Sequence, residues 1–76
     1  MELKFNQDEM KYQVGNRLIE SGFTIEVYDE ISDTWFKGKV GYNEAYEHKY
    51  YITLMTCGGG ELGQSELKYY SEARIA

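Results

Sequence analysis

The stretch GFTIEVYDEISDTWFKGKVGYNEAYEHKYYITLMT, residues 22–56, contains three segments in which apolar and polar residues alternate. In the first of them, Phe23, Ile25 and Val27 occupy every second position. An alternation with a period of two is typical of a strand that buries one face. We therefore predict three consecutive strands, joined by polar turns, at residues 23–28, 34–42 and 50–56.

Shorter alternating segments lie before this stretch. Residues 2–5 and 10–14 are separated by four polar residues, and this pattern predicts an N-terminal β-hairpin. Residues 17–20 are too few for a helix, and we expect them to place Leu18 or Ile19 at one end of the core.

The C-terminal part of the chain alternates less clearly. Leu62 and Leu67 are predicted to be separate core anchors, and Ser65 is predicted to begin a helical turn that runs into Lys68. A short closing strand at residues 73–75 is predicted to follow. A closing strand over residues 68–75 is the alternative.

Gly38 lies in the middle of the second predicted strand. A glycine at such a position indicates a bulge, a bend or the close approach of another strand, and a bend lets a short sheet curl into a barrel. The chain has 76 residues, a length that suits one domain with a small core. The sequence therefore predicts an all-β fold class: one barrel domain over residues 1–76, with about five strands, an N-terminal hairpin and at most one helical turn.

Charge and cysteine content limit the classes of function. The net charge of −5 disfavours direct nucleic-acid binding, because phosphate contacts depend on Lys and Arg. The single cysteine, Cys57, cannot form an intramolecular disulfide, which points to a reducing compartment. No apolar run approaches the roughly 18 residues of a membrane span. We therefore expect a cytoplasmic protein without a membrane segment.

Three sequence features suggest chemistry at first sight. Residues 58–63, GGGELG, fit the GxGxxG pattern, but a dinucleotide-binding loop needs a following helix in a βαβ unit of about 30 residues. His48 and Cys57 are each the only residue of their kind, which leaves a catalytic pair without a third, orienting group and a zinc ion without four ligands. We expect His48 to be a solvated loop residue and Cys57 a strand-end residue. The sequence predicts no enzyme activity, no cofactor and no metal.

Aromatic side chains outside the predicted core form the first group of candidate binding residues. Aromatic residues make up 16% of the chain, and eight of them are Tyr. Tyr and Trp are enriched at protein interfaces, although in a small barrel the same rings can be an overflow of the core. Both interpretations stay open for Trp35, Tyr42, Tyr46, Tyr51, Tyr69 and Tyr70.

Acidic residues on the first central strand and in the two following loops form the second group. Residues 29–33 lack the alternating ligands and the central glycine of a calcium loop, so we interpret them as a solvated turn. The group consists of Glu26, Asp29, Glu30, Asp33, Glu44 and Glu47.

The central strands carry a family resemblance. Gly22 before the first strand, WFKGKV at residues 35–40 and the aromatic third strand resemble SH3-like barrels of the Tudor type. Tudor domains hold methylated Lys or Arg in an aromatic cage through cation–π attraction. The resemblance implies Trp35, Tyr42 and Tyr50 as cage residues, although Tyr42 and Tyr50 share the parity that we assign to the core.

A second resemblance covers nearly the whole chain, which is similar to small domains of unknown function from bacterial mobile elements. The matching segments are LKFN at 3–6, KY at 11–12, SG at 21–22, IEV at 25–27, Trp35, YY at 50–51 and ARI at 73–75. This family usually has Arg-Ile-Glu where the present chain has Lys39, Val40 and Gly41. The resemblance implies a phage or plasmid setting and transfers no active site.

These observations lead to three hypotheses of function. The first is a protein-binding module that uses Trp35, Tyr46, Tyr51 and the acidic loops to hold a protein partner. The second is an inhibitor of a host defence nuclease, of anti-CRISPR or anti-restriction type, in which the six acidic residues take the place of DNA phosphates. The third is a nucleic-acid-binding barrel that uses Lys37 and Lys39 beside Trp35. The oligomeric state is left open.

Overall fold

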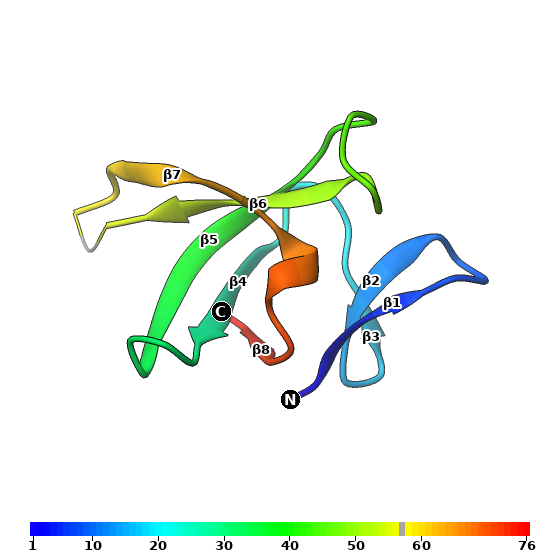
Figure 1. Cartoon of the computed structure of the whole chain (residues 1–76), viewed down its shortest axis with the longest axis horizontal. Helices are drawn as coiled ribbons and strands as arrows, with labels where there is room; N and C mark the ends of the chain where they lie inside the picture. Colours follow the sequence, from blue (N-terminus) through cyan, green and yellow to red (C-terminus); the bar gives the residue numbers. More distant parts are fainter. Residues whose placement is uncertain (57) are drawn as a thin grey trace.

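The computed structural model describes residues 1–56 and 58–76 and contains two antiparallel sheets (Figure 1). The first has the order β1-β2-β3 and the second the order β7-β6-β5-β4-β8. The strands are β1 (Leu3–Asn6), β2 (Lys11–Val14), β3 (Arg17–Leu18), β4 (Thr24–Asp29), β5 (Thr34–Tyr42), β6 (Tyr50–Met55), β7 (Glu61–Glu66) and β8 (Ala73–Ile75), with the 3-10 turn η1 (Leu67–Tyr69) before β8. The all-β fold class is confirmed, as are the N-terminal hairpin, the three central strands and the closing strand. A helical turn is also present, but Ser65 does not begin it, because Ser65 pairs with Ile52 within β7 and the turn begins at Leu67. Cys57, which we expected at a strand end, lies outside the described residues.

Strand β7 has no counterpart among the predicted elements. Its residues opposite Ile52 and Leu54 of β6 are Ser65 and Gly63, so small residues stand where an alternating pattern would show apolar ones. Leu62 is 57% exposed, and its prediction as a core anchor is wrong because it falls between the core-side positions of this strand. Leu67 is fully buried, as predicted.

The two sheets share one hydrophobic core. The chain end is tied to the segment before β8, because the Leu3 amide donates to the Ser71 carbonyl (3.0 Å) and the Ala73 amide to the Met1 carbonyl (2.8 Å). These hydrogen bonds hold the N-terminal sheet next to β8 of the larger sheet. The buried residues are Leu3, Tyr12, Val14, Ile19, Ile25, Val27, Val40, Tyr50, Ile52, Leu67 and Ala73.

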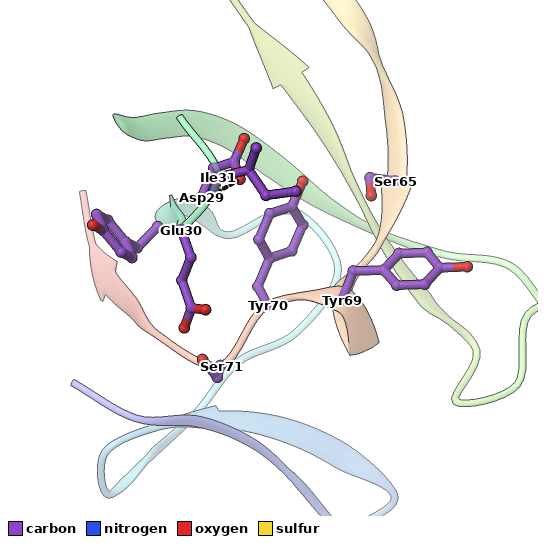
Figure 2. Close-up of a pocket in the computed structure, with 8 residues that line it drawn as sticks. Asp29, Glu30, Ile31, Ser65, Tyr69, Tyr70 and Ser71 are labelled. Carbon is purple, nitrogen blue, oxygen red and sulfur yellow. Dashed lines mark hydrogen bonds between the residues drawn. The ribbon is translucent and has the colours of Figure 1, made fainter. Parts of the chain in front are cut away.

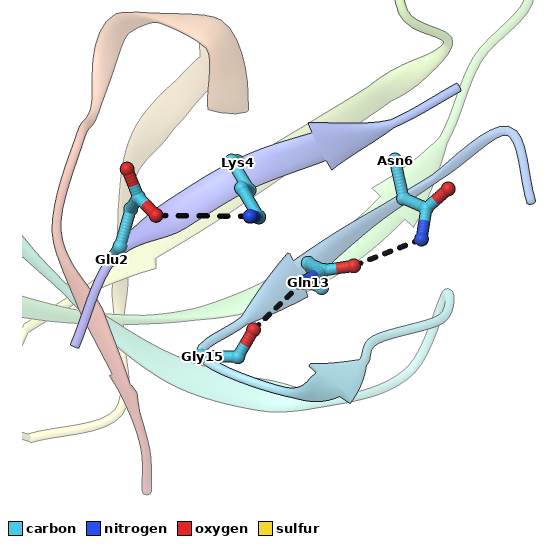
Figure 3. Close-up of polar contacts among 5 residues, drawn as sticks. All are labelled: Glu2, Lys4, Asn6, Gln13 and Gly15. Atoms are coloured by element: carbon cyan, nitrogen blue, oxygen red, sulfur yellow. Dashed lines mark hydrogen bonds and ion pairs between the residues drawn. The ribbon is translucent and has the colours of Figure 1, made fainter. Parts of the chain in front are cut away.

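The outward face of the N-terminal sheet is polar (Figure 3). The Asn6 amide nitrogen donates to the Gln13 side-chain oxygen (2.9 Å), and the Gln13 amide nitrogen donates to the Gly15 carbonyl (2.8 Å). Lys4 lies 4.0 Å from the Glu2 carboxylate. Because side chains alternate between faces along a strand, these residues leave Tyr12 and Val14 of β2 to enter the core.

An aromatic cluster joins the N-terminal sheet to the loop between β5 and β6. The His48 ring stacks on Phe5 with ring centroids 4.2 Å apart, and Tyr12 meets both rings edge-on. Tyr12 also contacts Tyr50 at 6.3 Å. His48 is therefore half-buried in a packed cluster rather than solvated as we expected, because the hairpin carries Phe5 across the loop.

The Tyr12 hydroxyl makes stability sensitive to alkaline pH. Burial, together with the nearby carboxylates of Glu66 and Glu47, raises the pKa of Tyr12 to about 12. Below the ordinary Tyr pKa of roughly 10, this group is protonated in both states and stability is unaffected. Between about pH 10 and 12 only the unfolded chain releases the proton, so stability falls, by at most roughly 3 kcal/mol. We expect Tyr12→Phe to remove this part of the alkaline loss in urea titrations from pH 8 to 12; an unchanged slope would contradict the assignment.

Gly38 lies where residues of β6 pack directly against the backbone of β5. A Cβ atom at this position would lie 2.5 Å from Cγ1 of Ile52 and 2.7 Å from the Thr53 carbonyl oxygen. The sequence prediction of a close approach is thereby confirmed. No other residue fits this position without moving a neighbouring backbone.

Adding a methyl group at Gly38 is expected to destabilise the fold. Gly38→Ala should lower the free energy of unfolding by about 1–3 kcal/mol, because overpacking moves buried backbone. Gly58→Ala is the matched control, since its Cβ would lie 4.0 Å from the Thr56 hydroxyl oxygen. The midpoint of urea denaturation is measured for both variants. Equal midpoints would contradict the prediction, because they would show that β6 can move aside without loss of stability.

Candidate functional site

The two acidic loops predicted to contact a partner lie at opposite ends of β5. Asp29 ends β4, and Glu30 and Asp33 lie in the turn that leads to β5. Glu44 and Glu47 belong to the loop after β5. Strand β5 has nine residues, so roughly 26 Å separates the two loops at about 3.3 Å per residue. The structure therefore does not bring the two acidic loops together.

The turn before β5 uses its own carboxylates. Asp29 accepts hydrogen bonds from the Ile31 amide (3.1 Å) and the Ser32 hydroxyl (3.0 Å). The Tyr28 hydroxyl donates to Asp33, and this bond raises the pKa of Tyr28. Asp33 has a φ of 53°, a left-handed conformation that Asp tolerates better than most residues. Asp29 and Asp33 thus hold the shape of the turn.

Two further carboxylates are held by cations. The Arg74 Nε donates to Glu26 (2.8 Å), and the Lys68 ammonium donates to Glu47 (3.1 Å). The hydrogen bond from Lys68 lowers the pKa of Glu47. Four of the six residues proposed as phosphate substitutes are therefore engaged within the chain.

The predicted aromatic residues also divide into two groups. Tyr46 and Tyr51 lie 5.7 Å apart beside the loop after β5, and Tyr51 covers Gly41. Both are half-buried, which favours the packing interpretation for this pair. Trp35 lies at the other end of β5, 5.4 Å from the Tyr28 ring and 4.0 Å from the Arg74 guanidinium.

The implied methyl-lysine cage is not formed. Trp35 and Tyr42 stand seven residues apart on β5 and on opposite faces of the sheet. Tyr50 is buried in the core, and Tyr42 packs against it while staying 49% exposed. The parity of the strand therefore excludes these three rings from one cage.

A groove at one end of the larger sheet combines acidic and aromatic residues, and we call it the end groove (Figure 2). The turn between β4 and β5 forms one wall, and β7 and η1 form the other. Its volume is about 370 Å³. The lining residues are Tyr28, Asp29, Glu30, Ile31, Ser65, Tyr69, Tyr70 and Ser71.

The end groove owes its shape to Leu67. This residue is fully buried, and the Tyr70 amide donates to its carbonyl (3.1 Å), which closes the 3-10 turn. With the turn anchored there, Tyr70 points toward Asp29 and Ile31, whereas Tyr69 points away from them (Figure 2). In the sequence, Tyr69, Tyr70 and the acidic segment 29–33 are separate candidates. The 3-10 turn anchored by Leu67 brings the two tyrosines to the same groove as the acidic residues.

The rim of the end groove exposes apolar surface beside negative charge. Ile31 is 99% exposed and Tyr69 is 69% exposed. Glu30 adjoins Ile31 and is itself exposed. Aromatic side chains are enriched at protein interfaces, so the Tyr-lined groove with Ile31 and Glu30 on its rim is a candidate site for protein binding.

A second groove, which we call the side groove, lies between the beginning of β5 and the hairpin of β6 and β7. It is more apolar than the end groove, and its volume is about 590 Å³. The stacked pair of Trp35 and Arg74 stands at its side. The lining residues are Glu26, Thr34, Trp35, Phe36, Lys37, Met55, Thr56, Gly59 and Leu62.

Comparisons of the chain with protein-family models, with curated proteins and with solved structures found no match. The family resemblances therefore stay predictions from sequence. Over residues 1–56 and 58–76, no helix has the length and apolar character that crossing a bilayer requires. Among those same residues, no three His, Asp or Glu side chains gather around a position suited to a metal ion.

The contact between Trp35 and Arg74 should be measurable as a coupling energy. A double-mutant cycle with Trp35→Leu and Arg74→Gln is expected to give about 0.5–1 kcal/mol, as for other partly exposed cation–π pairs. The Glu2 and Lys4 pair is the control, and its 4.0 Å separation at the surface predicts a coupling near zero. Urea denaturation provides both values. Equal couplings would contradict a specific role for the stacked guanidinium.

Proposed function

We propose that this chain is a non-enzymatic protein-recognition module whose end groove binds an extended, basic segment of a partner protein. The observation that carries the proposal is a groove lined by Tyr28, Tyr69 and Tyr70, with the exposed side chains of Ile31 and Glu30 on its rim. Apolar and aromatic groups supply the contact area in such interfaces, and charge selects the partner.

The chemistry of the end groove defines the segment that it fits. Tyr-lined grooves bind extended segments, proline-containing ones above all, because such segments lose little conformational entropy on binding. Within the described residues Glu30 makes no ion pair, so its carboxylate is available to Lys or Arg of the partner. The proposed ligand therefore combines proline or other apolar residues with at least one basic residue.

The sequence resemblance to domains of bacterial mobile elements supports a phage or plasmid setting for this activity. The nuclease-inhibitor alternative is less well supported, because the two acidic loops lie at opposite ends of β5 and four of the six carboxylates have partners within the chain. Protein recognition needs only the end groove, where the acidic turn and the tyrosines meet.

Peptide selection followed by affinity measurement tests the proposed function. Octapeptides selected from a random displayed library on the immobilised protein should be enriched in Lys or Arg. In fluorescence polarisation, Tyr69→Ala should weaken their binding about tenfold, and Glu30→Gln should weaken it and reduce its salt dependence.

Tyr42→Ala is the matched control, because Tyr42 is exposed to a similar degree but lies at the opposite end of β5. It should leave the affinity unchanged. Selected peptides without basic residues, or equal losses for the Tyr69 and Tyr42 variants, would overturn the assignment of the end groove.

A further inference from the structure

Strand β5 is paired along different lengths on its two sides. On one side Thr34–Lys39 pairs with β4, whereas on the other side pairing with β6 covers only Gly38–Tyr42. Residues 34–37 therefore have no ladder partner on the β6 side within the described part of the chain. Figure 1 shows the reason, since the hairpin of β6 and β7 diverges from the beginning of β5.

The backbone of this segment directs hydrogen-bonding groups into the opening. The Val40 amide donates to the Phe23 carbonyl and the Val40 carbonyl accepts from the Gly22 amide, so both groups of Val40 point to the β4 side. Backbone groups of alternate residues in an antiparallel strand point the same way. Trp35 and Lys37 therefore direct theirs toward the opposite side, where the side groove lies.

The side groove supplies apolar contacts along the same edge. Trp35 and Phe36 line it from β5, and Met55 and Leu62 line it from the hairpin. Leu62 is 57% exposed, so the far wall of the groove offers apolar surface to an incoming chain. An open strand edge with side-chain pockets beside it is the arrangement used for β-strand addition.

The charges beside the groove favour an acidic ligand. Lys37 is exposed, and its cross-strand neighbour Glu26 is bonded to Arg74 instead. Lys39 follows on the same face of β5. Neither lysine forms an ion pair among the described residues, which leaves two cations on the outer face of a chain that is acidic overall.

We propose that the side groove binds an extended acidic segment of a partner protein, which adds to the free edge of β5 as a further strand beside residues 34–37. Apolar side chains of the segment pack on Trp35, Met55 and Leu62, and one of its carboxylates meets Lys37. This site is separate from the end groove and has the opposite charge preference.

The probe is the peptide acetyl-Ser-Val-Glu-Val-Glu-Val-Glu-Ser-amide, added to the isotope-labelled full chain. Hydrogen exchange followed by NMR should show at least tenfold slower exchange at the Trp35 and Lys37 amides when the peptide is saturating. The same peptide with N-methyl groups on alternate residues, placed to block its strand edge, should give no protection. Slowing by the methylated peptide, or no slowing at all up to millimolar peptide, would overturn strand addition.

Variants separate this site from the end groove. Lys37→Glu and Leu62→Ser change exposed side chains, and each should weaken the Val–Glu peptide at least fivefold. Reversing the charge on the peptide should weaken binding as reversing it on the protein does. A peptide with Lys in place of Glu should therefore bind to the parent chain no more tightly than the Val–Glu peptide binds to Lys37→Glu. Tyr69→Ala changes the end groove only, so it should leave the affinity for the Val–Glu peptide unchanged. The two proposed sites can therefore be tested independently of each other.

Discussion

The close approach of β5 and β6 at Gly38 is the constraint on which the rest of the structure depends. Gly38 and Lys39 are the only β5 positions that pair with both β4 and β6 among the described residues. Ile52 and the Thr53 backbone occupy the space that a side chain at Gly38 would need. Before this point the residues of β5 pair with β4, and after it they pair with β6. β5 therefore joins the two parts of the larger sheet.

The divergence at Gly38 also explains why the molecule has grooves. Where β5 leaves β6, the beginning of β5 and the β6–β7 hairpin enclose the side groove. The turn that joins β4 to β5 lies on one side of the end groove, and the 3-10 turn anchored by Leu67 lies on the other. Buried Leu67 and the N-terminal sheet close the core from the other side. The grooves are thus consequences of how a short sheet bends around a small core.

Although the net charge is negative, acidic and basic side chains gather at different places on the surface. The end groove has an acidic rim, whereas the outer face of β5 presents Lys37 and Lys39. Several other charges are taken up in pairs, such as Lys11 with Glu20 and Lys68 with Glu47. Exposed pairs of this kind add little stability, but they decide which carboxylates and ammonium groups stay available to a partner.

The sequence by itself determined the fold class and the position of most strands, because alternation with a period of two depends only on which face of each strand is buried. It also indicated the special role of Gly38, the helical turn near Leu67 and the closing strand. It missed β7, whose core side carries Gly63 and Ser65, and it placed Leu62 in the core. Small residues at an edge strand produce no apolar alternation to read.

Only the tertiary structure decided which candidate residues belong together. Strand parity in the sequence already separates Trp35 from Tyr42, but sequence spacing could not show that Arg74 stacks on Trp35. It could not show that Tyr70 meets the acidic turn, since Leu67 anchors that contact through burial. Local patterns determine strands, whereas the grouping of side chains depends on register and on the close contact of β5 with β6 at Gly38, which involve residues far apart in the chain.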